Sequence, residues 1–206
     1  MNNIELSTEQ IIIEAAEAEF LEKGYGNTKT VAIARRAGVS HSMLHYYFRT
    51  KEQLFQKIFR AKAHTLTQMF SGIFEKKRPF TETIRLVVET QFNFIAQNPQ
   101  LPQFIINELL LNKDNRNWAI ETLFPQIYPI YCTLEKMLNK EIAKGTVRPI
   151  SMRNLILNIV SINVLSFVAF PVLQDAFQLN SPKKQDSFLN ERCESNVQFI
   201  LNALKP

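Results

Sequence analysis

The sequence predicts an all-α protein, and three observations lead to this prediction. Apolar side chains recur at helical spacing along most of the 206 residues, and no stretch shows the sustained alternation of a half-buried strand. Good helix caps, such as Ser7 and Ser40, precede several of these stretches. Only five glycines occur, which leaves little material for a β fold rich in turns. We expect about nine helices in total.

The N-terminal part of the chain begins with three predicted helices. Ser7 and Gln10 form a potential capping box at the start of the first helix, and Gly24 is placed to end it. Two short helices follow over residues 30–37 and 41–48. Short helices joined by small turns indicate a compact module in this region.

A change in composition separates this module from the rest of the chain. A fourth helix is expected from about residue 50 to residue 73, where apolar residues keep a helical spacing. All nine prolines lie after residue 78, and Pro79 marks the boundary in composition. Further helices are expected at about residues 81–97, 102–112, 116–144 (bent or broken near Pro125 and Pro129), 151–172 and 186–204.

The charge of the chain is distributed unevenly. Residues 1–22 hold six acidic and no basic residues, whereas residues 23–62 hold nine Lys and Arg against Glu52 alone. The net charge of +5 therefore includes a concentrated basic block. Such a block indicates a polyanionic partner, and nucleic acid is favoured over a membrane surface.

The segment 29–48 has the pattern of a helix-turn-helix motif. Its two short helices are joined by the three residues 38–40, and Gly38 permits the turn conformation. Ala34 and Ala37 are small enough to let the helices approach each other. In such a motif the second helix enters the major groove of DNA. The apolar contact between the helices is expected from Ile33, Val39 and Leu44.

Residues 24–55 resemble the DNA-binding domain of the TetR family of transcriptional repressors. Ser42 departs from the family pattern, which often has Gly there, and His45 stands where Tyr is usual. Both departures lie on the second helix of the motif, so they affect which operator sequence is expected rather than the fold. The resemblance implies a helix-turn-helix DNA-binding domain over residues 1–60 and an effector-binding and dimerisation domain over residues 61–206. The matching residues are Gly24-Tyr25, Thr28, Thr30, Ile33-Ala34, Ala37-Gly38-Val39-Ser40, Leu44, Tyr47-Phe48, Lys51-Glu52 and Leu54-Phe55.

The resemblance also implies roles for individual residues in DNA binding. One group lies on the face of the second helix that is turned toward base edges, and a second group contacts the sugar-phosphate backbone. Leu44 and Phe48 are assigned to the core. The expected base-reading residues are His41, Ser42, Met43 and Tyr46, and the expected phosphate contacts are Thr30, His45, Tyr47 and Lys51.

By the same resemblance, the protein is expected to be a ligand-responsive repressor that binds a palindromic double-stranded DNA operator as a homodimer. The dimer is expected through the last two long helices, residues 151–172 and 186–204. Aromatic residues in the central helices indicate an apolar or amphiphilic effector. The candidate effector-binding residues are Phe92, Phe104, Trp118, Phe124, Tyr128, Tyr131, Asn163 and Phe167.

Two alternative functions stay open at this stage. One is a helical small-molecule-binding protein with a degenerate DNA-binding head. The other is a metal-responsive regulator, since His41 and His45 are spaced i, i+4 on one helix and could together bind Zn²⁺. A third ligand is missing from the pattern, so we expect no metal and no cofactor. The sequence contains no G-x-S-x-G elbow, Walker loop or C-x-x-C pair, and we expect no enzyme activity.

The cysteine content and the N-terminus predict a cytoplasmic protein. Two cysteines, Cys132 and Cys193, are too few for a disulfide framework, and the N-terminus lacks the pattern of a signal peptide. The apolar stretch 155–173 approaches the length of a membrane span but contains several Asn and Ser residues. We expect it to be a helix buried in the core or in a subunit interface, and no membrane partner.

Overall fold

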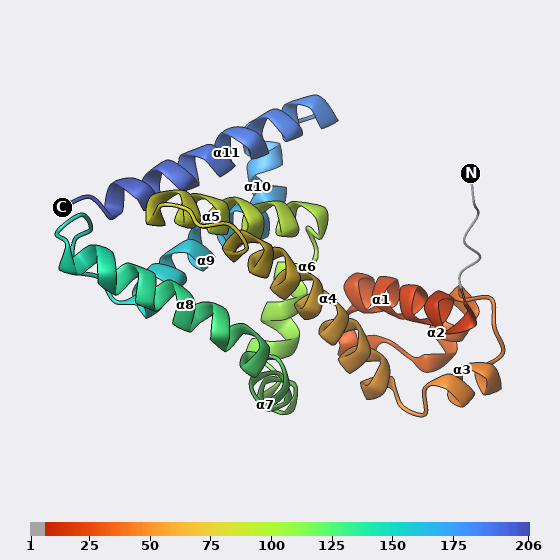
Figure 1. The fold of residues 1–206 in the computed structure, drawn as a ribbon. Helices are drawn as coiled ribbons and strands as arrows, with labels where there is room; N and C mark the ends of the chain where they lie inside the picture. Colours follow the sequence, from red (N-terminus) through yellow and green to blue (C-terminus); the bar gives the residue numbers. More distant parts are fainter. Residues whose placement is uncertain (1–6) are drawn as a thin grey trace, which may run out of the picture. The chain divides into compact units, whose positions relative to one another are not determined.

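The computed structural model describes residues 7–206, and all regular structure within this range is helical (Figure 1). It contains eleven α-helices and one π-helical segment, so the all-α prediction is confirmed and the expected number of helices was approximate. The chain divides into two compact units. The first comprises residues up to Thr65 together with Gln103–Leu123, and the second comprises Leu66–Pro102 and Phe124–Pro206.

The first unit begins with the predicted capping box. The Ser7 hydroxyl accepts a hydrogen bond from the Gln10 backbone N–H at 3.2 Å, and the Gln10 side chain accepts one from the Ser7 N–H at 2.9 Å. Gly24 interrupts the first helix with a φ of 77°, and one further turn follows it to Asn27. The elements of this unit are α1 (Thr8–Asn27), α2 (Thr30–Arg36), α3 (His41–Tyr47), the start of α4 (Lys51–Phe74), most of α6 (Leu101–Ile105), the π segment η1 (Ile106–Leu110) and α7 (Lys113–Thr122).

An aromatic cluster holds the segment 103–123 against α1 and α4 within the first unit. The ring of Phe104 stacks on Phe20 of α1, with centroids 6.4 Å apart, and lies 5.8 Å from the Phe55 ring of α4. Phe20 and Phe55 are both fully buried. Burial of such large rings contributes strongly to stability. Sequence reasoning places this segment in the C-terminal domain, whereas the compact unit that contains α1–α3 includes it.

The second unit is a bundle of long helices around one large apolar core. Ile84, Leu138 and Ile200, from three different helices, are buried in this core. Its elements are the end of α4, α5 (Phe80–Gln97), α8 (Phe124–Ala143), α9 (Met152–Val168), α10 (Phe170–Ala176) and α11 (Pro182–Ala203).

Several helix boundaries differ from those expected. The predicted helix 102–112 is divided between α6 and the π segment. The predicted helix 116–144 is two helices, because α7 ends at Thr122 and α8 begins at Phe124. Pro125 lies in the first turn of α8, where a missing N–H removes no helical hydrogen bond, and Pro129 is accommodated inside the same helix.

The apolar stretch near residue 155 forms a bent pair of helices. Helix α9 ends at Val168, and α10 begins at Phe170, where Pro171 occupies the first turn. Among the described residues no single helix is both long and apolar enough to cross a membrane. The pair α9 and α10 meets these criteria only when taken together, and it is bent by 57°.

Candidate functional site

The α2–α3 pair is a rigid scaffold built on a tight turn. Gly38 has a φ of 67°, which side-chain-bearing residues rarely adopt, and the Val39 N–H donates to the Ala34 carbonyl at 3.0 Å. Ile33, Ala34 and Leu44 are buried between the helices. The predicted helix-turn-helix geometry is therefore present in residues 30–47.

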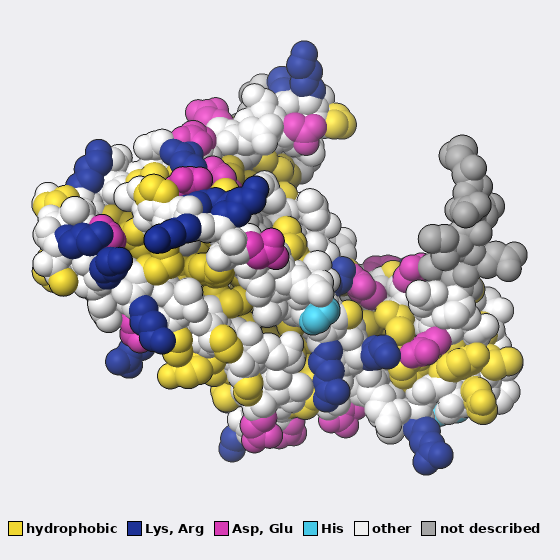
Figure 2. Space-filling view, in the orientation of Figure 1, with side chains coloured by type: hydrophobic (Ala, Val, Ile, Leu, Met, Phe, Trp, Pro, Cys, Tyr) yellow, Lys and Arg dark blue, Asp and Glu magenta, His cyan; other side chains and the backbone are white. Residues whose placement is uncertain are grey.

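The exposed face of α3 is unusually apolar for a surface. The helix is capped by Ser40, whose hydroxyl accepts from the Met43 N–H at 3.1 Å. Met43, Tyr46 and Tyr47 are exposed by 44%, 80% and 39%, and Figure 2 shows hydrophobic side chains gathered over this end of the first unit. A capped helix that presents large aromatic side chains to solvent indicates a binding surface.

The two histidines of α3 lie next to each other and to α2. The His41 Nε2 lies 3.0 Å from the Thr30 hydroxyl, and the His41 and His45 rings meet edge to face with centroids 4.4 Å apart. Thr30, His41 and His45 therefore form one continuous polar surface. In residues 7–206 no group of three or more His, Cys, Asp or Glu residues is placed to hold a metal ion.

Lys51 has a structural role in the fold of this unit. Its Nζ donates to the carbonyls of Tyr25 at 2.6 Å and Thr28 at 2.9 Å, and it lies 4.3 Å from the Tyr25 ring centroid. Burial lowers the pKa of this ammonium, and the carboxylate of Glu108 partly opposes that effect. The predicted phosphate contact of Lys51 stays a prediction, and its ammonium already holds the turn between α1 and α2.

Glu108 holds the other side of the same turn, and sequence reasoning missed it. This carboxylate is 7% exposed, and its Oε1 accepts a hydrogen bond from the Tyr25 N–H at 2.9 Å. It lies in the π segment, a local irregularity that is frequent at functional sites. Lys51 and Glu108 together fix the backbone that leads into α2. The two residues of the Glu108–Tyr25 bond are 83 positions apart, so no local pattern signals it.

Acidic residues of α1 pair with part of the basic block. Four of its nine basic side chains form ion pairs within the first unit, and Figure 2 shows both signs of charge mixed over the visible face of this unit. Among the described residues, exposed Lys29, Arg35 and Arg49 have no ion-pair partner. Positive charge is therefore available on both sides of α3. The pairs are Lys23–Glu19 (2.6 Å), Arg36–Glu19 (3.1 Å), Arg36–Glu22 (2.5 Å), Lys57–Glu9 (3.4 Å) and Lys62–Glu17 (2.8 Å).

The second unit contains an apolar cavity of about 210 Å³ between α4, α5, α8 and α9. An engineered cavity of about 150 Å³ binds benzene, so this volume suits a ring with a short substituent. Gln91 and Tyr131 are among its polar lining residues. The apolar wall includes Phe70, Val87, Ile130, Leu134, Ile156 and Ile159.

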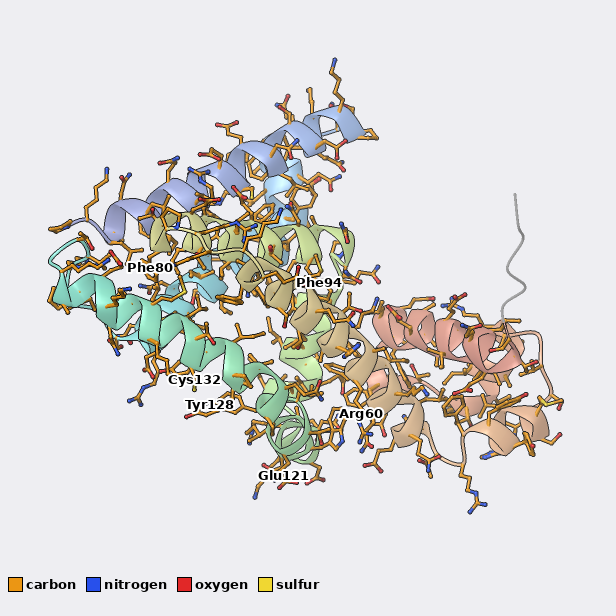
Figure 3. All side chains as sticks on the ribbon, in the orientation of Figure 1. Arg60, Phe80, Phe94, Glu121, Tyr128 and Cys132 are labelled. Atoms are coloured by element: carbon orange, nitrogen blue, oxygen red, sulfur yellow. The ribbon has the colours of Figure 1, made fainter. Side chains whose placement is uncertain are left out.

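Of the eight predicted effector-binding residues, Tyr131 lines this cavity. Phe92 and Phe167 pack on each other at 4.8 Å in a separate core cluster, and Asn163 is fully buried behind the cavity wall. Phe124 and Tyr128 are exposed on α8. Tyr128 and Cys132 lie near each other on this helix (Figure 3), and their hydrogen bond raises the pKa of Tyr128.

The remaining two predicted effector residues belong to the first unit. Phe104 is part of the aromatic cluster described above, and Trp118 packs edge to face on Phe55 at 6.2 Å. Arg60 extends from α4 (Figure 3), and its guanidinium carbon lies 5.7 Å from the Trp118 ring centroid. Aromatic spacing in the sequence therefore did not show which of these residues share a cavity.

The buried helix pair, the exposed face of α3 and the flanking cations have the geometry of a helix-turn-helix DNA-binding domain. Residues 12–58 match the family model for bacterial regulatory proteins of the tetR family. The match confirms the TetR-type DNA-binding domain that the resemblance predicted for the N-terminal part of the chain.

The curated relatives are regulators rather than enzymes. The fatty acid metabolism regulator protein of Bacillus subtilis is 28% identical over 104 residues, which are 50% of this chain and 53% of that protein. The nucleoid occlusion factor SlmA of Vibrio cholerae is 27% identical over 128 residues, or 61% of this chain and 65% of that protein. The chain thus spans about half to two thirds of the length of these relatives.

Solved structures share the fold over nearly the whole chain. A regulatory protein of the tetR family from Rhodococcus has a TM-score of 0.76 at 18% identity and covers 97% of this chain and 98% of its own. The transcriptional regulator FadR of Bacillus subtilis, in complex with stearoyl-CoA, has a TM-score of 0.67 at 19% identity, with 94% and 98% covered. The TM-scores show a common fold, and at these identities the likeness extends to the fold alone.

Proposed function

We propose that the protein is a ligand-responsive transcriptional repressor that binds a palindromic DNA operator as a homodimer. The observation that carries this proposal is the exposed face of α3, held by buried Leu44 and capped by Ser40. The proposal is supported by the match of residues 12–58 to the tetR family. A regulator of this kind acts in the cytoplasm, where it meets its operator.

In this proposal α3 enters the major groove and reads base edges. His41 and Ser42 supply polar groups that hydrogen-bond to bases, Met43 contacts a thymine methyl group, and Tyr46, with 80% of its surface exposed, contacts a further base edge. Thr30, His45, Tyr47 and Lys51 are the proposed backbone contacts. The exposed cations Lys29, Arg35 and Arg49 add a sequence-independent attraction that weakens as salt concentration rises.

The proposed homodimer uses apolar side chains that the chain leaves exposed in its last long helices. Leu157 and Leu165 of α9 are each 63% exposed, and Phe199 of α11 is 62% exposed. Covering these side chains with those of a second copy removes apolar surface from water, which favours association. A symmetric dimer then presents two α3 helices to half-sites about 34–36 Å apart, or a further helical turn away.

The proposed effector occupies the cavity of the second unit. The cavity is lined mostly by apolar side chains, and a regulator of the same fold has been solved with an acyl thioester, stearoyl-CoA. An effector that changes the separation of the two α3 helices lowers operator affinity without touching DNA. Coupling of this kind is typically about 1–3 kcal/mol.

Selection of bound duplexes from a random DNA pool tests the proposal. We expect a two-fold symmetric consensus, because a symmetric dimer reads two equivalent half-sites. Absence of enrichment even at low ionic strength contradicts the proposal and favours a helical ligand-binding protein with a degenerate head. Repeating the binding with Zn²⁺ and with a chelator tests the metal-responsive alternative, which requires that metal at His41 and His45 changes DNA binding.

A further inference from the structure

A chain of side-chain amides leads from half-buried Gln91 at the wall of the cavity to buried asparagines of α9 and α11. Gln91 of α5 lines the cavity, and its Oε1 accepts a hydrogen bond from the Asn163 Nδ2 of α9 at 3.1 Å. The Asn163 Oδ1 in turn accepts from the Asn196 Nδ2 of α11 at 2.9 Å. Asn163 and Asn196 are 0% and 1% exposed. Three helices of the second unit are thus joined by one polar relay inside an apolar core.

Backbone carbonyls fix the direction of this relay. The Asn163 Nδ2 also donates to the Val88 carbonyl at 3.0 Å, and the Asn196 Nδ2 lies 3.4 Å from the Ile162 carbonyl. A carbonyl oxygen only accepts hydrogen bonds, so Asn163 must turn its nitrogen toward Val88 and therefore toward Gln91. Gln91 must then face Asn163 with its oxygen. Reversing any one amide would place two donors or two acceptors opposite each other, and the unmet hydrogen bonds would lower stability.

The relay occupies the Gln91 Oε1 and leaves the Gln91 amide nitrogen as the free donor of this cavity-lining side chain. No described residue accepts a hydrogen bond from the Gln91 Nε2, whereas the Tyr131 hydroxyl is already bonded to Glu135 at 2.8 Å. Among the described lining residues there is no Asp, Glu, Lys, Arg or His. A charged ligand would enter this cavity without a counter-ion, and a purely apolar ligand would leave the amide N–H without a partner. The cavity therefore matches a neutral apolar molecule that carries a hydrogen-bond acceptor.

We propose that the cavity binds a small neutral molecule whose carbonyl oxygen accepts a hydrogen bond from Gln91, and that Asn163 and Asn196 position this donor. Ketones, aldehydes and esters with a ring or short chain are the ligand class. This inference rests on the proposed role of the second unit as an effector domain. In this proposal Gln91 selects the ligand. A bound carbonyl is then connected through Gln91 to the hydrogen bonds of Asn163 in α9 and Asn196 in α11.

Three probes of similar size test the ligand class, with binding to the full chain measured by calorimetry. Acetophenone offers a neutral carbonyl, ethylbenzene lacks an acceptor, and benzoate carries a charge. We expect acetophenone to bind at least about tenfold more tightly than either of the others, since one added hydrogen bond to a partly buried donor is worth on the order of 1.4 kcal/mol, a factor of ten. Equal binding of acetophenone and ethylbenzene, tighter binding of benzoate, or no binding of acetophenone at millimolar concentration overturns the inference.

Variants of Gln91 test whether this side chain makes the choice. Gln91→Leu should bind acetophenone and ethylbenzene equally. Gln91→Glu keeps an oxygen for Asn163 but presents an acceptor to the cavity, so it should prefer 1-phenylethylamine over acetophenone. The matched control is Gln97→Leu, an exposed glutamine on the same helix, which should keep the wild-type preference. A preference for acetophenone that survives in both Gln91 variants overturns the assignment.

The positioning role of the relay has a separate readout. Asn196→Leu removes the donor that holds Asn163, so we expect the ratio of ethylbenzene to acetophenone dissociation constants to fall several-fold while ethylbenzene affinity stays unchanged. An unchanged ratio overturns the positioning role. These measurements need no DNA, so loss of the carbonyl preference with an intact symmetric DNA consensus overturns this inference alone. Absence of any DNA preference overturns the proposed regulator instead.

Discussion

The two compact units present opposite kinds of binding surface. In the first unit, one short helix exposes polar and aromatic side chains to solvent, and its core contacts lie on the opposite face. In the second unit, the candidate site is a partly open apolar cavity between four helices, with Gln91 among its few polar groups. The exposed face suits a large, charged, hydrated partner, whereas the cavity suits a small apolar one. Substitutions on the exposed face of α3 should therefore change recognition without changing stability, whereas substitutions in the cavity wall should change both.

The largest expected effect is loss of the core beneath α3. Leu44→Ala removes a side chain that is fully buried between α2 and α3, and it should lower the free energy of unfolding of the first unit by about 2–5 kcal/mol. Denaturant titration, followed with a signal that reports on the first unit, measures this change in the free energy of unfolding. The control Leu165→Ala removes an exposed side chain of α9 and should change stability by less than about 0.5 kcal/mol in a monomeric sample. Equal effects of the two substitutions would contradict the burial assigned to Leu44.

The contact of Glu108 with the turn after α1 should have the next largest effect. Glu108→Ala leaves the Tyr25 N–H without its acceptor and should cost about 1–3 kcal/mol of stability. Glu108→Gln keeps a carbonyl oxygen at this position and should cost less. Hydrogen exchange of the Tyr25 amide reports the contact directly. Unchanged protection of this amide in Glu108→Ala would show that the π segment does not hold the turn.

Two glycines should respond in opposite directions to the same substitution. Gly38→Ala forces a side chain into the left-handed region and should destabilise the protein by about 1–2 kcal/mol. Gly72→Ala in α4 meets open space and helical backbone, so it should stabilise by about 0.5–1 kcal/mol. Thermal unfolding of the two variants measures both changes. Destabilisation by Gly72→Ala would contradict the helical geometry at this position.

The smallest effect concerns the thiol of Cys193 in the second unit. Burial, with smaller contributions from Glu89 and Glu194, raises the pKa of this thiol to about 11. At pH 8 only about one thiol in a thousand is ionised, so alkylation should be slow and should accelerate about tenfold per pH unit up to pH about 10. Mass spectrometry of a Cys132→Ser variant isolates this reaction. Rapid labelling at pH 7 would contradict the burial.

The same pKa shift has a consequence for stability. The pKa of the folded thiol lies above its unfolded value, so the contribution is fully present below pH about 9 and declines as pH rises toward 11. Comparing Cys193→Ala with the parent across this pH window measures the difference. We expect the free energy of unfolding of the parent to fall relative to that of Cys193→Ala as pH rises. A rise of the parent relative to the variant would contradict the shifted pKa.

Helices α1–α3 of the first unit were predictable from sequence because their determinants are local. The Ser7–Gln10 capping box, the Ser40 cap and the turn at Gly38 each depend on residues a few positions apart, and the structure contains all three. The pairing of Glu9, Glu17, Glu19 and Glu22 with nearby cations was not predictable, because it requires the packing of α1 on its neighbours. The basic block is consequently less concentrated than its sequence suggests.

The second unit was predictable only in its helical class. The residues that line the cavity come from positions 66 to 160. Helical periodicity does not reveal which apolar helix faces meet around a cavity. Asn163 was singled out from sequence, but its partners Gln91 and Asn196 lie 72 and 33 positions away. Likewise, nothing local indicated that residues 103–123 pack with the first unit.

The most direct test of the central claim compares the face of α3 with its charged flank. Dissociation constants are measured for the selected operator and for a scrambled duplex, using wild type, Tyr46→Ala and Arg49→Ala. We expect Tyr46→Ala to weaken operator binding by about 1–3 kcal/mol with little change for scrambled DNA, and Arg49→Ala to weaken both and to lower the salt slope by about one. If the two substitutions weaken both duplexes to the same extent, α3 does not read DNA sequence.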